Sequence, residues 1–478
     1  MDFLDQVNNK IEENKTEMIS SLSKLISMPS VAADETGAQP FGAGVQEAFK
    51  WMLETAENDG FATYNADNFG GHIDFPGKGP GIVGIIGHLD VVPEGDNWDF
   101  DPYGGEVIDG FVCGRGTMDD KGPVIASYYA MKALQQCGYK PDKTIRLILG
   151  LDEETNWQGM RYYVSQVPNL PDCGFTPDAD FPVISAEMGI LVFDLIKKLP
   201  EAKGKGVELT SIKGGTAPNS VPDYARAVIN DTTGGGYEFI KEMVANARKD
   251  KGWKITCKGV GKSFEIAVAG VSAHGAHPEK GENAISILMD FLGGINFLND
   301  GVADFISFYN SAIGFDLKGE TIGCAMSDEI SGDLVFNVGM IDVDKKTAKV
   351  TINVRYPVSC EAEDVYAGLE TVMARYDMGV VKGKHQWPLH VSDDSPLVKT
   401  LMGVYAKHTG DTESKPLVIG GGTYARAMDN IVAFGARFPG EAEPGHQRNE
   451  RISIENLMKL TRIYAEAAYE LSKDEVQK

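Results

Sequence analysis

The stretch of sequence that decides the fold is Gly81-Ile-Val-Gly-Ile-Ile-Gly87, which His88-Leu-Asp90 follows at once. The run before His88 contains only apolar residues and glycine, without polar alternation, which is typical of a strand covered on both faces. We predict two more buried strands, at 145–151 and 431–434. Three such strands indicate the centre of a mostly parallel sheet in an α/β domain.

Helical patterns alternate with these strands in the outer parts of the chain. Apolar residues recur at helical spacing over 3–27 and again over 453–471. A helix over 45–59 would end at Gly60, and a helix over 123–136 would begin with a proline, which the first turn tolerates. The alternation predicts helices on both faces of the sheet.

The middle of the chain has a different pattern, in which shorter alternating strands lie between helices. A chain of 478 residues is too long for one ordinary core, so at least two domains are expected. We predict a split α/β domain formed by 1–190 and 391–478. An inserted α+β domain would occupy 191–390, with strands such as 264–269 and 348–355.

Composition narrows the class of protein. Hydrophobic residues make up 42% and charged residues 24%, which is globular, and the net charge of −24 argues against a nucleic-acid or anionic-membrane partner. The N-terminus lacks the pattern of a signal peptide, and no apolar run approaches the ~20 residues of a membrane span. The six cysteines form no CxxC pair and are expected to be free thiols. These features predict a cytoplasmic protein.

Acidic and imidazole groups directly follow the predicted strands. His88 and Asp90 follow the first strand, 152–154 (Asp-Glu-Glu) follow the second, and His446 follows the third by a dozen residues. Ligands of open α/β sheets bind beyond the carboxyl ends of the strands. Neighbouring carboxylates repel one another unless cations are present, and two zinc ions ~3.5–4 Å apart can share a bridging carboxylate and a water.

Each motif alone also has an ordinary structural explanation. His88 and Asp90 alone are typical of a strand-end hydrogen bond, and 152–154 alone of a solvated acidic turn. Asp119-Asp120-Lys-Gly122 alone is suited to capping the helix that follows it. Only the joint pattern favours a metal centre.

Longer motifs carry a resemblance to a known family. Gly87-His-Leu-Asp-Val-Val-Pro93, Gly114-Arg-Gly-Thr-Met-Asp-Asp-Lys-Gly122 and Asp152-Glu-Glu-Thr155 resemble the M20 family of metallopeptidases, and Val271-Ser-Ala-His-Gly275 resembles its lid motif. Three further segments resemble the dipeptidase V group of that family: Gly174 to Pro182, Gly420 to Arg426, and Glu443-Pro-Gly-His-Gln447.

This resemblance implies a ligand set for two zinc ions, although manganese or cobalt fits the same donors. His88 and Asp178 would bind one ion, and His446 and Glu154 the other. Asp119 would bridge both ions.

The resemblance also implies the remaining roles. Glu153 would be the general base, and Asp90 would accept the free N–H of His88 and so fix its tautomer. His274 would stabilise the oxyanion from the inserted domain at 191–390, which would act as a lid. The substrate would be held by Asn219, Arg355, Gly422 and Thr423.

The resemblance implies the hydrolysis of unblocked dipeptides. It also implies a monomer, because the long insert of the dipeptidase V group resembles two fused copies of the short lid through which other family members dimerise. Two alternatives stay open: an N-acyl amino acid deacylase of the same fold, and a non-catalytic peptide-binding homologue. Within the family, an aspartate at the position of Asp178 accompanies amino- and dipeptidases, whereas glutamate accompanies carboxypeptidases and deacylases.

Overall fold

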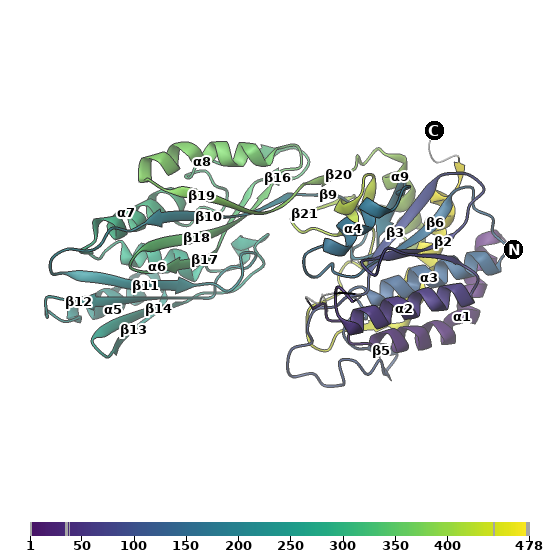
Figure 1. Ribbon diagram of the computed structural model, residues 1–478, viewed down its shortest axis with the longest axis horizontal. Coiled ribbons are helices and arrows are strands. Elements are labelled where there is room, and N and C mark those ends of the chain that lie inside the picture. The colour runs from purple at the N-terminus through teal and green to yellow at the C-terminus, as the bar shows by residue number, and fades with distance from the viewer. Residues whose placement is uncertain (1, 34–36, 38, 443–444, 475–478) are drawn as a thin grey trace. The chain divides into compact units, whose positions relative to one another are not determined.

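The computed structural model describes residues 2–33, 37, 39–442 and 445–474 (Figure 1). The chain divides into two compact units. Unit 1 comprises 1–186, 389–418 and 422–478, and unit 2 comprises 187–388 with 419–421. The α/β class and the insertion of a second, α+β unit into the first agree with the expectation from sequence. The sequence predicts changes of domain at 190 and 390, and the compact units change over at 186 and 388.

A nine-stranded sheet forms the centre of unit 1. Its order is β1 (Ala62–Asn65), β2 (Gly71–Phe75), β6 (Thr144–Gly150), β3 (Ile82–His88), β7 (Cys173–Thr176), β22 (Ile431–Ala433), β9 (Ile184–Glu187) and β20 (Leu389–His390), with β21 (Leu417–Ile419) paired to β9. The four strands β6, β3, β7 and β22 are parallel to their neighbours in this group. The pairs β1–β2, β2–β6 and β22–β9 are antiparallel, so the three strands predicted from apolar runs all lie in the parallel centre.

Helices cover both faces of this sheet (Figure 1). The core on one face contains side chains from α1 (Phe3–Ile26), α2 (Ala43–Asn58), α3 (Lys121–Gln136), α9 (Pro396–Thr409) and α10 (Ile454–Leu471). The other face packs against α4 (Gln158–Gln166) and the 3-10 helix η3 (Tyr424–Ala427). Ile85 of β3 lies in the core with α1, α2, α3, α9 and α10, and Ile86 lies in the core with α4 and η3. A strand buried on both faces explains the apolar run without alternation.

The N-terminus of α3 decides between two explanations of the acidic pair that precedes it. Asp120 occupies the N-cap position, but its side chain makes no capping hydrogen bond. Its Oδ2 instead accepts from the backbone N–H of His88, at 3.1 Å. The Asp120 side chain therefore supports the end of β3 and does not cap the helix.

Unit 2 contains an eight-stranded antiparallel sheet. Its order is β13 (Lys254–Val260), β14 (Ser263–Ala269), β12 (Tyr224–Asp231), β11 (Val207–Gly214), β17 (Val335–Val343), β18 (Thr347–Tyr356), β10 (Gly189–Lys198) and β19 (Gly379–Gln386). One hydrophobic core joins the sheet to α5 (Glu238–Lys251), α6 (Ala284–Leu292), α7 (Asp300–Phe308) and α8 (Ala362–Tyr376).

Shorter elements complete the chain. They are the three-stranded sheet of β24 (Arg451–Ser453), β5 (Phe111–Cys113) and β4 (Val107–Ile108), the pair β8 (Ala179–Asp180) and β23 (Ala436–Arg437), the pair β15 (Ser327–Asp328) and β16 (Gly332–Asp333), the 3-10 helix η1 (Pro278–Lys280) and the π-helix η2 (Tyr309–Ile313). All six cysteines are free thiols. Within the described ranges, no helix combines the length and apolar character needed to cross a membrane.

A buried histidine lies on β2, away from the predicted site residues. The Nδ1 of His72 is 2.8 Å from the hydroxyl of Tyr163, and its Nε2 is 3.6 Å from the carboxylate of Asp74. Asp74 in turn accepts two hydrogen bonds from Arg146, at 2.8 and 2.9 Å. Burial and the positive charge of Arg146 lower the pKa of His72 to about 4, although Asp74 acts in the opposite direction.

This histidine makes stability depend on pH. An unfolded histidine has a pKa of about 6.5, so the unfolded chain binds the proton first as the pH falls. Above pH ~6.5 His72 is neutral in both states and does not reduce the free energy of unfolding. By pH ~4, protonation of the unfolded chain should have lowered this free energy by about 2–3 kcal/mol. In urea denaturation of chelator-treated protein, His72→Asn should remove this part of the decline, whereas the exposed control His390→Asn should keep it. Equal declines in the wild type and His72→Asn would contradict the assignment.

Candidate active site

Three neighbouring strands deliver the predicted site residues to one edge of the parallel centre. His88 ends β3, Glu153 and Glu154 follow β6, and Asp178 follows β7. The order β6-β3-β7 places β3 between the other two strands. Because the carboxyl ends of parallel strands meet at one edge, these side chains lie close together.

The carboxylate of Asp119 lies between two imidazoles. Its Oδ1 is 3.1 Å from the Nε2 of His88, and its Oδ2 is 3.1 Å from the Nε2 of His446. Each imidazole has a second acidic neighbour: the Nε2 of His88 is 3.5 Å from Asp178 Oδ2, and that of His446 is 2.9 Å from Glu154 Oε1. The result is two nitrogen–oxygen sets that share one carboxylate.

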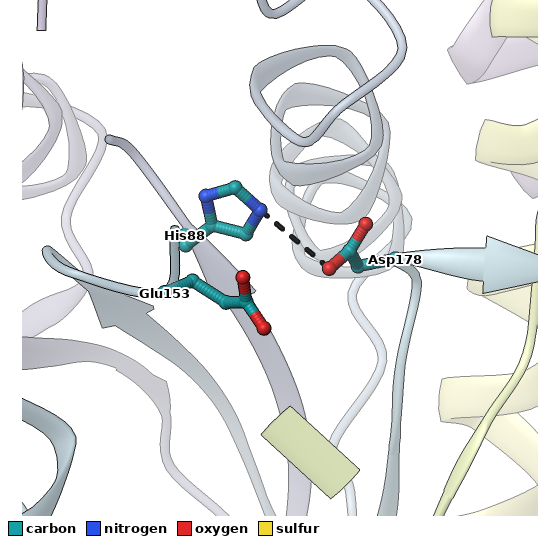
Figure 2. A group of neighbouring side chains, drawn as sticks. All are labelled: His88, Glu153 and Asp178. Atoms are coloured by element: carbon teal, nitrogen blue, oxygen red, sulfur yellow. Dashed lines mark ion pairs between the residues drawn. The ribbon is translucent and has the colours of Figure 1, made fainter. Parts of the chain in front are cut away.

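The donor atoms of these sets are close enough to hold metal ions. Figure 2 shows His88, Glu153 and Asp178 directed toward one another, and their candidate ligand atoms lie within 4.8 Å of each other. The same holds for His88, Asp119 and Glu154. Histidine nitrogens and carboxylate oxygens about 2.0–2.2 Å from a common ion would be spaced in this range. Their chemistry therefore fits zinc or a similar divalent ion.

The carboxylates of this group are buried close to one another, which disfavours their charged forms. Burial and the charge of Asp178 raise the pKa of Glu153 well above its usual range, and burial and the charge of Asp119 also raise those of Glu154 and Asp178. Hydrogen bonds to Asp119 and Glu154 raise the pKa of His446 to about 11. Several carboxylates that compete for two imidazoles indicate a site that gains from added positive charge.

Asp90 supports the site in a way that differs from the expectation. The closer acceptor for the Nδ1 of His88 is the backbone carbonyl of Asp90, at 2.9 Å, whereas the Asp90 carboxylate is 3.4 Å away. That carboxylate accepts from the backbone N–H groups of Glu153 and Glu154, at 3.1 and 3.0 Å. One residue thus orients the imidazole through its backbone and the acidic turn through its side chain.

Two aromatic residues that sequence reasoning missed lie against the same turn. The indole N–H of Trp157 donates to the carbonyl of Glu153, at 2.8 Å. The Trp157 ring meets the Tyr424 ring edge-on with centroids 5.0 Å apart, and Tyr424 is edge-on to His88 at 6.2 Å. The two rings therefore pack against the acidic turn at 152–154. Local sequence offers no signal for this contact, because Tyr424 is far along the chain.

Gly422 and Thr423, the two predicted substrate-binding residues of unit 1, lie just before η3. The hydroxyl of Thr423 accepts from the backbone N–H of Ala425, at 3.1 Å, and so caps the short helix. A Cβ on Gly422 would lie 3.1 Å from the guanidinium carbon of Arg426, so a side chain there would crowd the arginine. Glycine at this position leaves the backbone open.

The remaining predicted residues belong to unit 2. Asn219 and His274 lie on adjoining loops, because Gly275 donates its N–H to the Asn219 carbonyl at 2.8 Å. The Nδ1 of His274 accepts from the N–H of Ala276 at 3.2 Å, which leaves Nε2 as the protonated nitrogen of a neutral ring. Arg355 is buried on β18.

Solved structures share this fold over nearly the whole chain. Human carnosine dipeptidase 1 aligns with a TM-score of 0.60 at 16% identity, covering 99% of both chains. The di-peptidase Dug1p from Saccharomyces cerevisiae gives 0.59 at 15% identity over 99% of both chains. Aminoacylhistidine dipeptidase from Vibrio alginolyticus gives 0.55 at 16% identity, over 95% of this chain and 96% of that one. At these identities the likeness concerns the fold alone.

Sequence comparison gives the family. A "Putative dipeptidase" of Staphylococcus haemolyticus is 37% identical over 480 residues, which span 97% of this chain and 98% of the relative. The "Putative dipeptidase YtjP" of Bacillus subtilis is 36% identical over 474 residues, 97% of this chain and 99% of the relative. The model of peptidase family M20/M25/M40 matches residues 84–470. The chain with this paired histidine and carboxylate centre belongs to peptidase family M20/M25/M40.

Proposed function

We propose that this protein is a di-zinc dipeptidase that hydrolyses unblocked dipeptides. The observation that carries the proposal is the Asp119 carboxylate, which offers one oxygen to His88 and the other to His446. With Asp178 beside the first histidine and Glu154 beside the second, each ion would have three protein ligands. Three ligands leave a position open, as in catalytic zinc sites.

The chemistry divides between the ions and the chain. Bound ions would polarise the scissile carbonyl and make the attacking water more acidic. Glu153 faces the ligand atoms of His88 and Asp178, and its neighbour in the chain is a proposed ligand. It takes the proton of the attacking water and delivers it to the leaving amine. Asp90 and Trp157 hold the backbone from which Glu153 projects.

Unit 2 is proposed to act as a lid. His274, with Nδ1 engaged by a backbone N–H, presents Nε2–H as a donor for the oxyanion. Asn219 and Arg355 of unit 2 are proposed to hold the substrate, and Arg355 to pair with its carboxylate. The backbone at Gly422 and Thr423 is proposed to bind the C-terminal carboxylate of the substrate. A planar arginine fork is suited to a carboxylate. The names of the sequence relatives support a dipeptide as substrate, and aspartate at 178 favours this over an acylated amino acid.

We also propose that the protein is a cytoplasmic monomer. The edge strand β13 carries Lys254 and Lys258, and the other edge strand, β19, carries Lys382 and Lys384. Charged residues on edge strands oppose the pairing of sheets between molecules. Six free thiols are in keeping with a reducing compartment.

Metal content tests the shared carboxylate. We expect about two zinc ions in the wild type, because two ligand sets share Asp119. Asp178→Ala breaks one set and should leave about one ion, whereas Asp119→Ala breaks both and should leave almost none. Elemental analysis after gel filtration measures this, with the exposed Asp67→Ala as control. Full peptidase activity in a metal-free preparation would refute the proposal.

Substitution of Glu153 tests the general base. Glu153→Gln keeps the size of the side chain but cannot take up the proton, so kcat should fall by about 10²–10⁴-fold. Zinc content should stay at the wild-type value, because Glu153 is not among the proposed ligands. A near-normal kcat would assign the base to another group.

A panel of four substrates tests recognition of both ends. We compare kcat/KM for one dipeptide, its N-acetyl form, its C-terminal amide and the corresponding tetrapeptide. The free dipeptide should be preferred by tenfold or more, since an unpaired buried charge costs several kcal/mol and ~1.4 kcal/mol is tenfold in rate. Arg355→Met should reduce the preference for the free acid over the amide. Better cleavage of the N-acetyl form would indicate a deacylase.

A further inference from the structure

A buried ion pair lies beside the proposed metal ligands and has no part in the proposed reaction. Arg115 is 1% exposed and Glu450 is fully buried, and their Nη1 and Oε2 atoms are 2.6 Å apart. The two residues are far apart in sequence. Arg115 lies in the loop before α3, and Glu450 lies just before β24.

Glu450 holds the backbone of the loop that presents Asp119. Its Oε1 accepts three backbone hydrogen bonds, from Gly116 at 3.1 Å, Met118 at 2.8 Å and Asp119 itself at 3.2 Å. Three donors that converge on one oxygen fix the orientation of these peptide groups. The position of the Asp119 side chain between the two imidazoles depends on that orientation.

Arg115 extends the same connection to two other loops. Its Nη1 donates to the carbonyl of Gln447, at 3.2 Å, and Gln447 is the neighbour of His446. Its Nη2 donates to the carbonyls of Pro93 and Glu94, at 3.3 and 3.5 Å, in the loop that continues from β3 beyond His88. The ion pair therefore joins the chain segments around three proposed ligands.

The energetics favour a positional role. The carboxylate of Glu450 is fully buried, and it accepts four hydrogen bonds. Both carboxylate oxygens face donors, which the ionised form satisfies and a protonated form would not. A buried ion pair contributes little net stability compared with apolar packing. What this pair does provide is a fixed geometry for the loops.

We propose that Arg115 and Glu450 are positioning residues that hold the Asp119 and His446 loops in metal-binding geometry before any ion binds. The inference rests on the proposed function for the identity of the ligands. It extends that function, because neither residue donates an atom to the metal or the substrate.

The test is the zinc affinity of Glu450→Gln. Glutamine keeps the size and one carbonyl oxygen, but its amide N–H₂ would face the donor of Arg115. We expect zinc affinity to fall by about 10–100-fold, the usual loss when a supporting partner of a ligand is removed. Competition with a chromogenic chelator measures the affinity of the full-length protein without any substrate. Far-UV circular dichroism of the metal-free protein checks folding.

Asp74→Asn provides a matched control. It makes the same chemical change at another arginine–carboxylate pair of unit 1, the half-buried Asp74 with the buried Arg146, on β2 and β6 and outside the ligand-bearing loops. This control should lower thermal stability but leave zinc affinity within about twofold. Arg115→Lys is the second test variant, because it keeps the charge but loses the fork that reaches the carbonyls. It covers the case in which Glu450→Gln does not fold.

The outcomes separate the two proposals. Weaker zinc binding in Glu450→Gln or Arg115→Lys, with normal binding in Asp74→Asn, supports the positioning role. Normal zinc affinity in folded variants overturns it, and so does equal weakening in Asp74→Asn, which would reveal a general effect of stability. A wild-type protein that binds no zinc overturns the proposed function itself.

Discussion

The structure of unit 1 depends on one electrostatic constraint, the concentration of carboxylates at the carboxyl end of a buried parallel sheet. Asp119, Glu153, Glu154 and Asp178 surround two imidazoles, and the pKa of the last three acids is raised, chiefly by burial. Such a group is unfavourable unless cations offset its charge. The surrounding chain therefore has to hold the acids in place against their mutual repulsion.

The sheet meets this requirement because its central strands are covered on both faces. β3 is completely buried, so His88 leaves the sheet from a fixed backbone. Asp120 then binds the N–H of His88, and Asp90 binds the N–H groups of the acidic turn. In each case a carboxylate outside the proposed ligand set satisfies the backbone of a ligand or of its neighbour. Backbone hydrogen bonds of this kind fix direction as well as distance.

Much of this could be predicted from sequence, and the failures have physical causes. Apolar runs predicted β3, β6 and β22. Helical spacing of apolar residues predicted α1 and α10, and Gly60 marked the end of α2, all within a few residues of the observed ends. The strand β7 gave no such signal, because Cys173–Thr176 is short and contains glycine, and its burial comes from neighbouring strands. Asp178 was therefore identified only through family resemblance. The antiparallel margins of the sheet also lacked a signal, since pairing direction depends on topology rather than on local pattern.

The support around the ligands was the least predictable part, because it joins segments hundreds of residues apart. Glu450 lies 331 residues along the chain from Asp119, from whose N–H it accepts a hydrogen bond, and no spacing rule connects the two positions. Ligand side chains can be recognised by type, since few residues bind metals. Residues that orient ligands through the backbone can be of almost any type, and only the folded chain reveals them. It follows that a chain can keep every ligand and still lose its metal affinity through one substitution at such a supporting residue.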